Sequence, residues 1–541
     1  MRKLLWIVPV VGAAVLYACV GDDPGATGGD VNPDAGSSGA DAPTGTGPAC
    51  TTSSTCPATT PTCTNGVCTA CDPKQTPSDC STFHAATPKC GPAGACVECV
   101  SGGDDAGASP ECAQKATAPF CGPNNTCVEC LTANHCAPHV CGNDNACRPC
   151  QKHSECPAGA CGEDGNCVAG SMIAYVDNGG MTHAACAAAR QPINGNTLAS
   201  AYCGIDDALG GKPYVVVIGH GAAAPYGAFS ATGTVTIIGP GGSVSTPAVV
   251  GGSLALPASG NVIDVISPGA APGVTIDGFE VTSTSSSSTG LHCKATVAGR
   301  LLRLRNSYVH DVHGDALYNE NCNLVLEDNK VSGTDIRAIE DANTVTPVTY
   351  TIQRNVFANG NADGVYVDAD LTFDRNTVSN YTAGNGLQVN GSNSYRITNS
   401  FFFLNRTGVD FNTSGTPPVR VFQFNTVAFN GSNAFYCGTG VIESSIVTNN
   451  ADAPSSLSGC TTSHVVSDDA GAPAFVNSND PSKYDFHLAV DTAPHVSANM
   501  ACCIDKVPPT FDAGAPLPDH DYDGTKRPKG GGYDIGAHEA Q

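Results

Sequence analysis

Seven side chains recur at one place in a repeated pattern, and their types suit contact with a sugar polymer. Each follows a small residue and an apolar residue, as Tyr366 follows Gly364 and Val365. If the repeats stack as strands, these side chains form one row with a spacing of about 4.8 Å, and a hexose chain advances by a similar length. The row consists of His292, Tyr318, Glu340, Tyr366, Gln388, Asp410 and Tyr436. The candidate ligand-binding residues are Tyr318, Glu340, Tyr366, Asp410 and Tyr436, with Asp315 beside them.

A flanking row adds the one group suited to catalysis on such a polymer. It contains Asp315, Arg337, Asp363 and Asn385. A lyase acting on uronates needs a base and carboxylates that hold calcium, so Arg337, Glu340 and Asp363 are the catalytic candidates. A hydrolase needs two carboxylates within roughly 5–9.5 Å, whereas Glu340 and Asp410 lie three repeats, about 14 Å, apart. An ordinary solvated strand face explains the same residues without a ligand.

Short strands in repeats of 21 to 26 residues must position these rows. Each repeat between Val274 and Val447 turns at an asparagine, as at Asn355, and apolar and polar residues then alternate with strand periodicity. One repeat cannot bury its apolar side chains alone, so we expect repeats to stack in parallel. Asparagine suits the bend because its short side chain tolerates left-handed backbone. The apolar members then form one buried column, namely Leu317, Ile339, Val365, Leu387, Val409 and Phe435.

This repeated stretch resembles the right-handed parallel β-helix of the pectin-lyase-like superfamily. The resemblance covers most of residues 171–465 and implies an all-β solenoid. It implies little about activity, because the Asn-Thr-Asp, paired-Asp and Arg-x-Lys signatures of that family's hydrolases are absent from the repeats. A sandwich of antiparallel hairpins is the alternative fold, although hairpins do not repeat a small-apolar-outward triplet seven times in register.

The C-terminal residues 466–541 carry a different pattern. The segments Tyr484-Asp485-Phe486-His487-Leu488 and Asp534-Ile535-Gly536-Ala537-His538-Glu539 resemble the C-terminal segment of secreted β-helix proteins called choice-of-anchor Q domains. We therefore expect a capping segment here. The carboxylates Asp519, Asp521 and Asp523 match the start of a calcium loop, but Gly530 at the twelfth position excludes an EF-hand. A calcium brace completed by Asp534 or Glu539 and a solvated acidic turn both stay open, and calcium is the one cofactor indicated.

Cysteines dominate residues 50–170. Of the 29 cysteines, 20 lie between Cys50 and Cys167, in five imperfect repeats of four. Cys-x-x-Cys steps also occur in zinc sites, but matching histidines are missing, so we expect disulfides whose connectivity the sequence does not give. Such units lack core residues, and cross-links substitute for packing. In the solenoid, Cys437 and Cys460 are one repeat apart, and we also pair Cys293 with Cys322 and Cys186 with Cys203; Cys502 and Cys503 have no assigned pairing.

The N-terminus has the features of an export signal. Arg2 and Lys3 precede the apolar run Leu4 to Leu16, which is too short to span a bilayer comfortably. The following Leu16-Tyr17-Ala18-Cys19 resembles a bacterial lipobox, which implies removal of residues 1–18 and a lipid anchor on Cys19. An ordinary signal peptide cleaved near Ala18 is the alternative. Residues 19–49 contain almost nothing apolar and are predicted to be a disordered tether.

Composition limits the function further. A formal charge of −24 argues against nucleic acid as a partner, because nucleic acid requires basic surfaces. Abundant cysteine indicates an oxidising compartment. We expect a lipid-anchored protein at the outer membrane or cell surface of a Gram-negative bacterium, attached by its lipid and binding glycan or another surface polymer. A polysaccharide lyase or other carbohydrate-active enzyme and a structural spacer are the alternatives, and the oligomeric state cannot be derived from the sequence.

Overall fold

The computed structural model describes residues 47–74, 79–100, 109, 110, 112, 113, 115–240, 248–252, 260–283, 285, 288–344, 347–415, 419–451, 457, 459–467, 473–478, 485–508 and 516–540. The predicted signal peptide, Cys19 and most of the predicted tether lie outside these residues. The chain forms two compact units, residues 1–100 and 101–541, which are described separately. Among the described residues, no helix has the length and apolar character needed to cross a membrane.

Disulfides with one connectivity organise the cysteine repeats. In the first unit, Cys50 bonds Cys63 and Cys56 bonds Cys68, so the first cysteine pairs with the third and the second with the fourth. The same order recurs in the repeat from Cys71 to Cys96, which contains α1 (Asp79–Phe83). The third and fourth cysteines face each other across two-stranded antiparallel ribbons. These ribbons are β1 (Thr62–Thr64) with β2 (Val67–Thr69) and β3 (Lys89–Cys90) with β4 (Cys96–Val97).

The second unit repeats this arrangement before the solenoid begins. Its described bonds are Cys112–Cys127, Cys130–Cys141, Cys136–Cys147, Cys150–Cys161 and Cys156–Cys167. Its ribbons are β5 (Phe120–Cys121) with β6 (Cys127–Val128) and β7 (Val140–Cys141) with β8 (Cys147–Arg148). All 28 cysteines that follow Cys19 are disulfide-bonded. The prediction of disulfides rather than zinc is confirmed, and so many disulfides indicate an oxidising, extracytoplasmic location.

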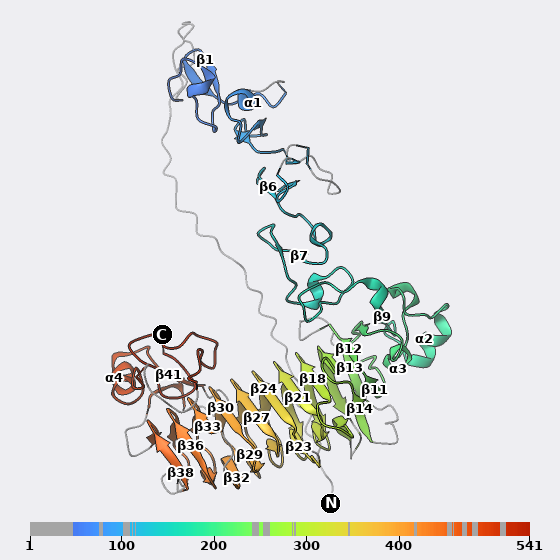
Figure 1. Cartoon of the computed structure of the whole chain (residues 1–541), viewed down its shortest axis with the longest axis vertical. Helices are drawn as coiled ribbons and strands as arrows, with labels where there is room; N and C mark the ends of the chain where they lie inside the picture. Colours follow the sequence, from blue (N-terminus) through green and yellow to red (C-terminus); the bar gives the residue numbers. More distant parts are fainter. Residues whose placement is uncertain are drawn as a thin grey trace, which may run out of the picture. The chain divides into compact units, whose positions relative to one another are not determined.

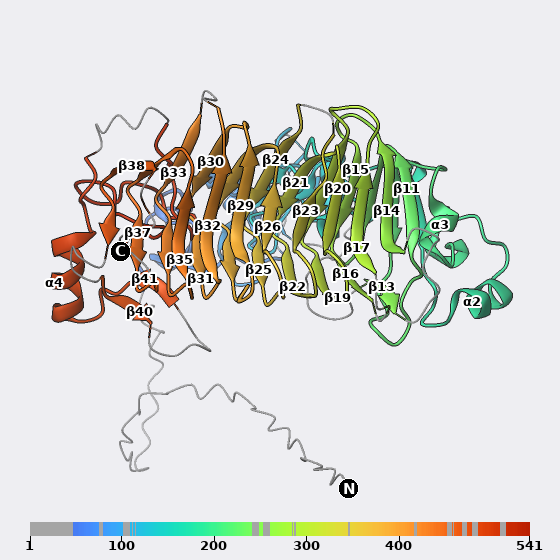
Figure 2. The same ribbon diagram turned by 90° about the horizontal axis from the view of Figure 1, so that it is seen from below.

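Residues 173–467 form a β-solenoid with three parallel sheets (Figures 1 and 2). The twelve-stranded sheet contains β9 (Ile173–Val176), β10 (Tyr214–Val217), β12 (Val235–Ile238), β15 (Val274–Asp277), β18 (Leu301–Arg305), β21 (Asn323–Glu327), β24 (Thr349–Gln353), β27 (Asp370–Asp374), β30 (Tyr395–Thr398), β33 (Arg420–Gln423), β36 (Gly440–Glu443) and β38 (Cys460–Ser463). The short helices α2 (His183–Ala189) and α3 (Ile205–Ala208) lie between its first two strands in sequence.

The other two sheets complete each turn. The ten-stranded sheet contains β13 (Ala248–Gly252), β16 (Phe279–Ser283), β19 (Tyr308–Val312), β22 (Lys330–Thr334), β25 (Val356–Ala358), β28 (Thr377–Ser379), β31 (Phe401–Phe403), β34 (Thr426–Ala428), β37 (Ile446–Thr448) and β39 (Val466–Ser467). The nine-stranded sheet contains β11 (Phe229–Gly233), β14 (Asn261–Pro268), β17 (Thr289–Lys294), β20 (Leu317–Glu320), β23 (Ile339–Asp341), β26 (Val365–Val367), β29 (Asn385–Gly391), β32 (Thr407–Thr413) and β35 (Asn433–Cys437).

The predicted buried column is confirmed. In the nine-stranded sheet Leu317 pairs with Ile339, Ile339 with Val365, and the register continues to Phe435. Every member of the column is at most 3% exposed. Parallel in-register stacking also excludes the hairpin sandwich, because the pairings within these three sheets are all parallel. The small-apolar-outward triplet is therefore the element that fixes which side chains point out of this sheet.

The left-handed bend predicted for asparagine is found at Asn306 and Asn399, whereas in four other turns the asparagine is the residue after the bend. Asn329, Asn355, Asn376 and Asn425 are buried and accept a backbone N–H from the previous turn through Oδ1. The left-handed residue is the one before each of them, such as Arg354 with φ 57°. Asn306 and Asn399 have that left-handed backbone, and the buried position beside them belongs to Ser307 and Ser400. Buried amides that bond along the stack, rather than bend geometry, therefore explain the repeated asparagine.

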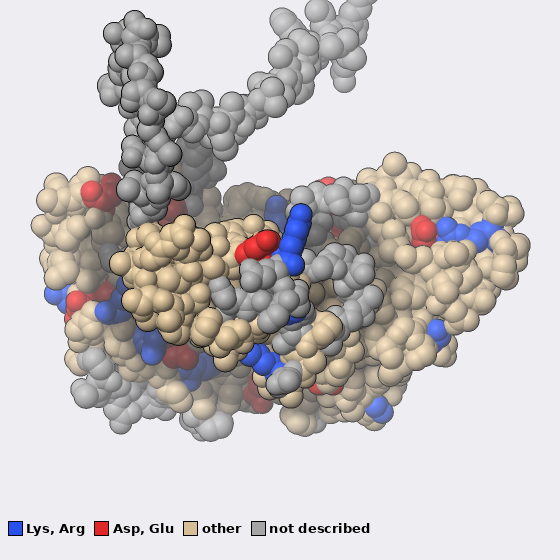
Figure 3. Space-filling model, turned by 90° about the horizontal axis from the view of Figure 1, so that it is seen from above, with Lys and Arg blue, Asp and Glu red and all other residues tan. Residues whose placement is uncertain are grey.

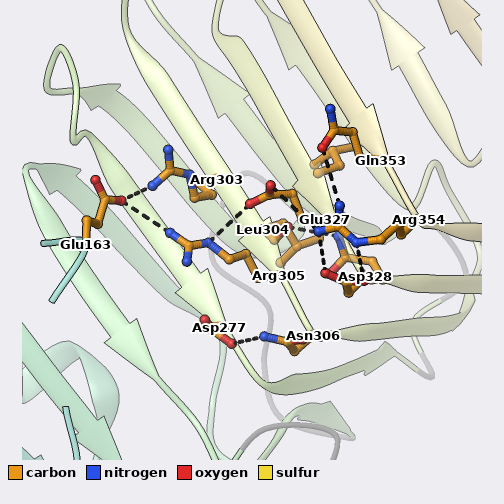
Figure 4. A network of polar contacts seen from close by, with 12 residues as sticks. Glu163, Asp277, Arg303, Leu304, Arg305, Asn306, Glu327, Asp328, Gln353 and Arg354 are labelled. Carbon is orange, nitrogen blue, oxygen red and sulfur yellow. Dashed lines mark hydrogen bonds and ion pairs between the residues drawn. The ribbon is translucent and has the colours of Figure 1, made fainter. Parts of the chain in front are cut away.

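The last disulfide repeat packs against the outer surface of the twelve-stranded sheet. Ala160 is fully buried in one apolar cluster with Ile173, Val216 and Ile238. Next to this cluster, Glu163 of the repeat forms ion pairs with Arg303 and Arg305 (Figure 4). The repeat is thus attached to the first turns of the solenoid by both apolar and charged contacts.

The C-terminal segment packs on the outside of the ten-stranded sheet. It contains β40 (Phe475–Asn477), β41 (Asp485–Leu488) and α4 (Ala493–Cys502). A second apolar core joins Phe401, Phe424 and Ile446 of the solenoid to Phe486 and Ile535 of the segment. This explains the run Phe401-Phe402-Phe403, because Phe402 enters the solenoid interior while Phe401 and Phe403 pack against the segment.

Candidate functional site

The predicted row of seven side chains lies on the outer face of the nine-stranded sheet. His292 pairs with Tyr318 and Tyr318 with Glu340, and Tyr366, Gln388, Asp410 and Tyr436 continue in the same register. Neighbouring members are therefore separated by one inter-strand spacing of about 4.8 Å. We call this surface the row face. The triplet pattern was enough to predict it because each turn contributes the same position.

The catalytic candidates lie together near the middle of the row face. The Arg337 guanidinium forms one ion pair with Glu340 and another, at 3.2 Å, with Asp363. It also stacks on Tyr366, with its central carbon 4.6 Å from the ring centroid. The Asp315 carboxylate accepts the backbone N–H of Arg337 at 3.0 Å. The four residues grouped from the sequence are thus neighbours, but the Arg337 guanidinium is already engaged by two carboxylates, which does not suit a base.

Asp410 is a carboxyl group of the row face whose pKa is raised above its ordinary value. Burial, and then the charge of Asp363, raise its pKa to about 6. Oδ2 of Asp410 accepts a hydrogen bond from Nδ2 of Asn385 at 3.3 Å. The same Nδ2 also donates to Oε1 of Gln388 at 3.1 Å. Burial likewise raises the pKa of Asp315. A carboxylic acid that keeps its proton near pH 6 can donate a hydrogen bond or a proton to a sugar oxygen.

The tyrosines of the row face differ in what they offer a ligand. Tyr436 is 53% exposed and is the most open of them. One face of Tyr366 is covered by Arg337, and Tyr318 tilts toward His292 with 5.5 Å between the ring centroids. His292 itself is placed between Asp264 at 2.9 Å and Glu320 at 3.2 Å. The open stacking surface is therefore at the Tyr436 end.

Charged side chains of both signs occur elsewhere on the molecule. On the face shown in Figure 3, residues that are neither acidic nor basic predominate, and blue and red groups are interspersed. On the twelve-stranded sheet, Arg354 binds Asp328 through two nitrogens, each at 2.8 Å (Figure 4). Arg305 continues the network to Glu327 at 3.5 Å. These groups are engaged with one another, which fits a structural network.

The three aspartates that were predicted to bind calcium each contact different partners. Both Asp521 oxygens accept backbone N–H groups, from Thr525 at 2.7 Å and from Glu539 at 2.9 Å. Asp519 pairs with its neighbour His520. Asp523 points toward His487, with Oδ2 3.1 Å from Nε2. The three aspartates thus have three separate roles, because Asp521 is used to fold the turn itself, and they do not converge on one ion.

Disulfides form at all three pairs proposed for the solenoid. Cys186 bonds Cys203, Cys293 bonds Cys322 and Cys437 bonds Cys460. The last two connect neighbouring turns. Cys502 and Cys503 bond each other at the end of α4, a pairing that the sequence argument left open.

Sequence reasoning missed two histidines, His487 and His538. Both occur in the C-terminal motifs, yet only the fold shows that they meet at Asp523. The available signal in the sequence was that each of the two C-terminal segments with a family resemblance contains one histidine. Asn385, which orients Asp410, was recognised only as a flanking residue.

Comparisons with known proteins add a partial match. Residues 37–142 match a family of unknown function (DUF8331), which covers N-terminal disulfide repeats and none of the solenoid. A search of the curated proteins finds no match to this chain.

Proposed function

We propose that this protein binds glycan through the row face and does so at a bacterial surface. One observation carries the proposal: seven polar or aromatic side chains stand in register on successive parallel strands. Their period of about 4.8 Å matches a sugar polymer lying along the solenoid axis. Tyrosine rings supply stacking surface, and carboxylates and amides accept or donate hydrogen bonds to hydroxyl groups.

The charges of the row face favour a polymer without carboxylates. Arg337 is neutralised by Glu340 and Asp363, and Lys294 is paired with Glu320 at 2.7 Å. A uronate chain would therefore place like charges beside Asp363 and Glu340. Neutral polysaccharides avoid this repulsion, so we expect them to bind more tightly than polygalacturonate at low salt.

Affinity measurements with defined polysaccharides test this proposal. Tyr436→Ala removes the most exposed ring of the row and should weaken binding about 5- to 150-fold, because a lost stacking contact is worth about 1–3 kcal/mol by analogy with base stacking. The control is Phe83→Ala, which removes a 43% exposed ring in the first unit. Equal affinity of both variants and the unaltered protein would remove the row face from consideration. A glycan array without any binder would favour a structural spacer.

Cleavage of glycosidic bonds is the second candidate, and Asp410 is the observation that favours it. A carboxyl group with its pKa raised to about 6 resembles the acid of a hydrolase. Asp363 lies two turns away, about 9.6 Å by the strand spacing, near the upper limit for a hydrolase pair. Release of reducing ends by the protein, lost in Asp410→Asn, would establish cleavage. A lyase would instead yield unsaturated products that depend on Arg337.

The N-terminal anchor is supported by the cysteine pairing. All 28 cysteines after Cys19 are disulfide-bonded, and their even number is complete without Cys19. Together with the lipobox-like sequence, this cysteine pairing favours lipidation of Cys19. The lipidated residue would be followed by a tether and by the disulfide repeats, which carry a solenoid of pectin-lyase-like type. Its C-terminal segment would be related to choice-of-anchor Q domains. Metabolic labelling with a fatty acid should mark the protein, and Cys19→Ser should abolish the label.

A further inference from the structure

Three segments of the C-terminal region bring two imidazoles and a carboxylate to one point. His487 lies on β41, Asp523 in the turn after Asp521, and His538 in the final tail. Their ligand atoms all lie within 4.8 Å of one another. Among the described residues, this is the one group of three metal-type ligands that contains no disulfide cysteine. The row face and its proposed ligand play no part in it.

The distances between these atoms suit a small divalent ion. Oδ2 of Asp523 is 3.1 Å from Nε2 of His487 and 3.9 Å from Nε2 of His538. A tetrahedral ion with bonds of about 2.0–2.1 Å separates its ligands by roughly 3.3 Å. The observed separations lie on either side of that value. The longer separation exceeds it by about 0.6 Å.

The surroundings of His487 match those of a metal-binding imidazole. Its Nδ1 faces the Asp485 carboxylate, which fixes the proton on that nitrogen and leaves Nε2 with a free lone pair. Nε2 is buried and makes no hydrogen bond, and it is directed at Asp523. Phe401 and Tyr522 pack against the ring on its apolar side. The Asp523 side chain is 46% exposed, so an ion can enter from the solvent side.

We propose that His487, Asp523 and His538 bind one first-row divalent metal ion of the Zn²⁺ type. Two nitrogen ligands select such an ion over calcium, which takes oxygen ligands almost exclusively. Three protein ligands leave a fourth position for water. The ion would join β41, the turn at Asp523 and the tail, and thereby cross-link three parts of the C-terminal segment.

Binding requires one rearrangement at His538. The backbone N–H of Leu488 donates to Nδ1 of His538 at 3.2 Å, so the neutral ring carries its proton on Nε2. When Nε2 binds the ion, this proton moves to Nδ1 through solvent and the bond from Leu488 is lost. A single hydrogen bond to a neutral ring is small beside the binding free energy of a metal with three protein ligands. The loss of the hydrogen bond from the Leu488 amide therefore shows that the metal site is occupied, separately from any measurement of metal affinity.

Calorimetry with ZnCl₂ on the chelator-treated full mature chain tests the proposal. We expect one ion per chain, and at least tenfold weaker binding in His487→Gln, His538→Gln and Asp523→Asn. The control is His495→Gln, which alters a histidine paired with Asp491 on α4, outside the group. Asp485→Asn should weaken binding 10- to 100-fold, as expected for a partner of a ligand.

Structural readouts keep the test decisive. Addition of one equivalent of Zn²⁺ should shift the Leu488 amide resonance in the unaltered protein, whereas Asp523→Asn should need at least tenfold more Zn²⁺ for the same shift. Asp523 is half-exposed, so this variant should fold even if a histidine variant does not, which circular dichroism will show. Zn²⁺ binding that is absent, equal in Asp523→Asn and His495→Gln, or replaced by preferential Ca²⁺ binding overturns the proposal.

Discussion

The side-chain amide of Asn355 donates to the side-chain oxygen of Asn376, one turn further along the solenoid, at 3.0 Å. The same amide donates to the carbonyls of Leu326 and Gln353, each at 2.9 Å. The bonds to Asn376 and Leu326 are buried, so solvent cannot readily replace Asn355 there if it is removed. Each asparagine in this stack satisfies backbone groups that parallel strands leave open at the bend.

Asn355→Ala should lower the free energy of unfolding by about 1–3 kcal/mol, because buried donors and carbonyls lose their partner. Asn355→Ser should cost less, because serine already occupies the equivalent position at Ser307, Ser400 and Ser445. The control is Asn361→Ala, which alters an exposed asparagine in the same turn. Urea unfolding measures all three. Equal losses for Asn355→Ala and Asn361→Ala would mean that the stack does not stabilise the fold.

Removal of the Cys437–Cys460 disulfide should lower stability by about 3 kcal/mol, from the entropy of the 23-residue loop that it closes. The comparison is Cys502→Ala with Cys503→Ala, because that bond joins adjacent residues and constrains the unfolded chain little. Thermal unfolding of both double variants provides the measurement. A larger loss in the adjacent pair would contradict the loop-entropy argument.

Asp341 should make the protein less stable as the pH rises from about 4 to 6. Burial raises the pKa of Asp341 from 3.8 to about 6, so in this range the folded protein holds a proton that the unfolded chain has released. The stabilisation is complete below the unfolded pKa and is lost as pH rises through the folded one, by about 1–3 kcal/mol. Urea unfolding at several pH values should show a flatter dependence in Asp341→Asn. Identical slopes would disprove the assignment.

Glu163→Gln should weaken the attachment of the last disulfide repeat by about 1 kcal/mol or less, because the ion pairs are partly exposed. The variant leaves Arg303 and Arg305 side by side without their shared partner. The loss should shrink in 1 M salt, where the screening length is about 3 Å. Asp164→Asn is the control, since Asp164 contacts Asn166 and neither arginine. Salt-independent losses would point to packing rather than charge.

The row face could be predicted because its information is local. A small residue, an apolar residue and an outward residue fix the pleat of each strand, and parallel stacking then aligns Tyr318 with Glu340. The buried stack was harder to place, since asparagine favours both the left-handed position, as at Asn306, and the buried one, as at Asn329. Only pairing between turns distinguishes them.

Contacts between distant segments were beyond sequence reasoning. Glu163 and Arg305 are separated by 142 residues, and nothing near either one indicates the other. His487 and His538 meet only because the C-terminal segment folds back on the ten-stranded sheet. The sequence predicted Asp523 as a calcium ligand in a site of oxygen atoms. The fold places two histidine nitrogens beside it, and these led to the proposal of a site with both nitrogen and oxygen ligands.

Register between consecutive turns has a consequence for how such a chain changes over evolutionary time. Duplication or deletion of one complete repeat would lengthen or shorten the row face by one side chain and leave the other turns intact. An insertion of part of a repeat would have to lie in a loop, because elsewhere it would displace the buried amides. The length of polymer that the row face can contact would therefore change by one inter-strand spacing for each repeat. The row-face side chains of the other turns would stay the same.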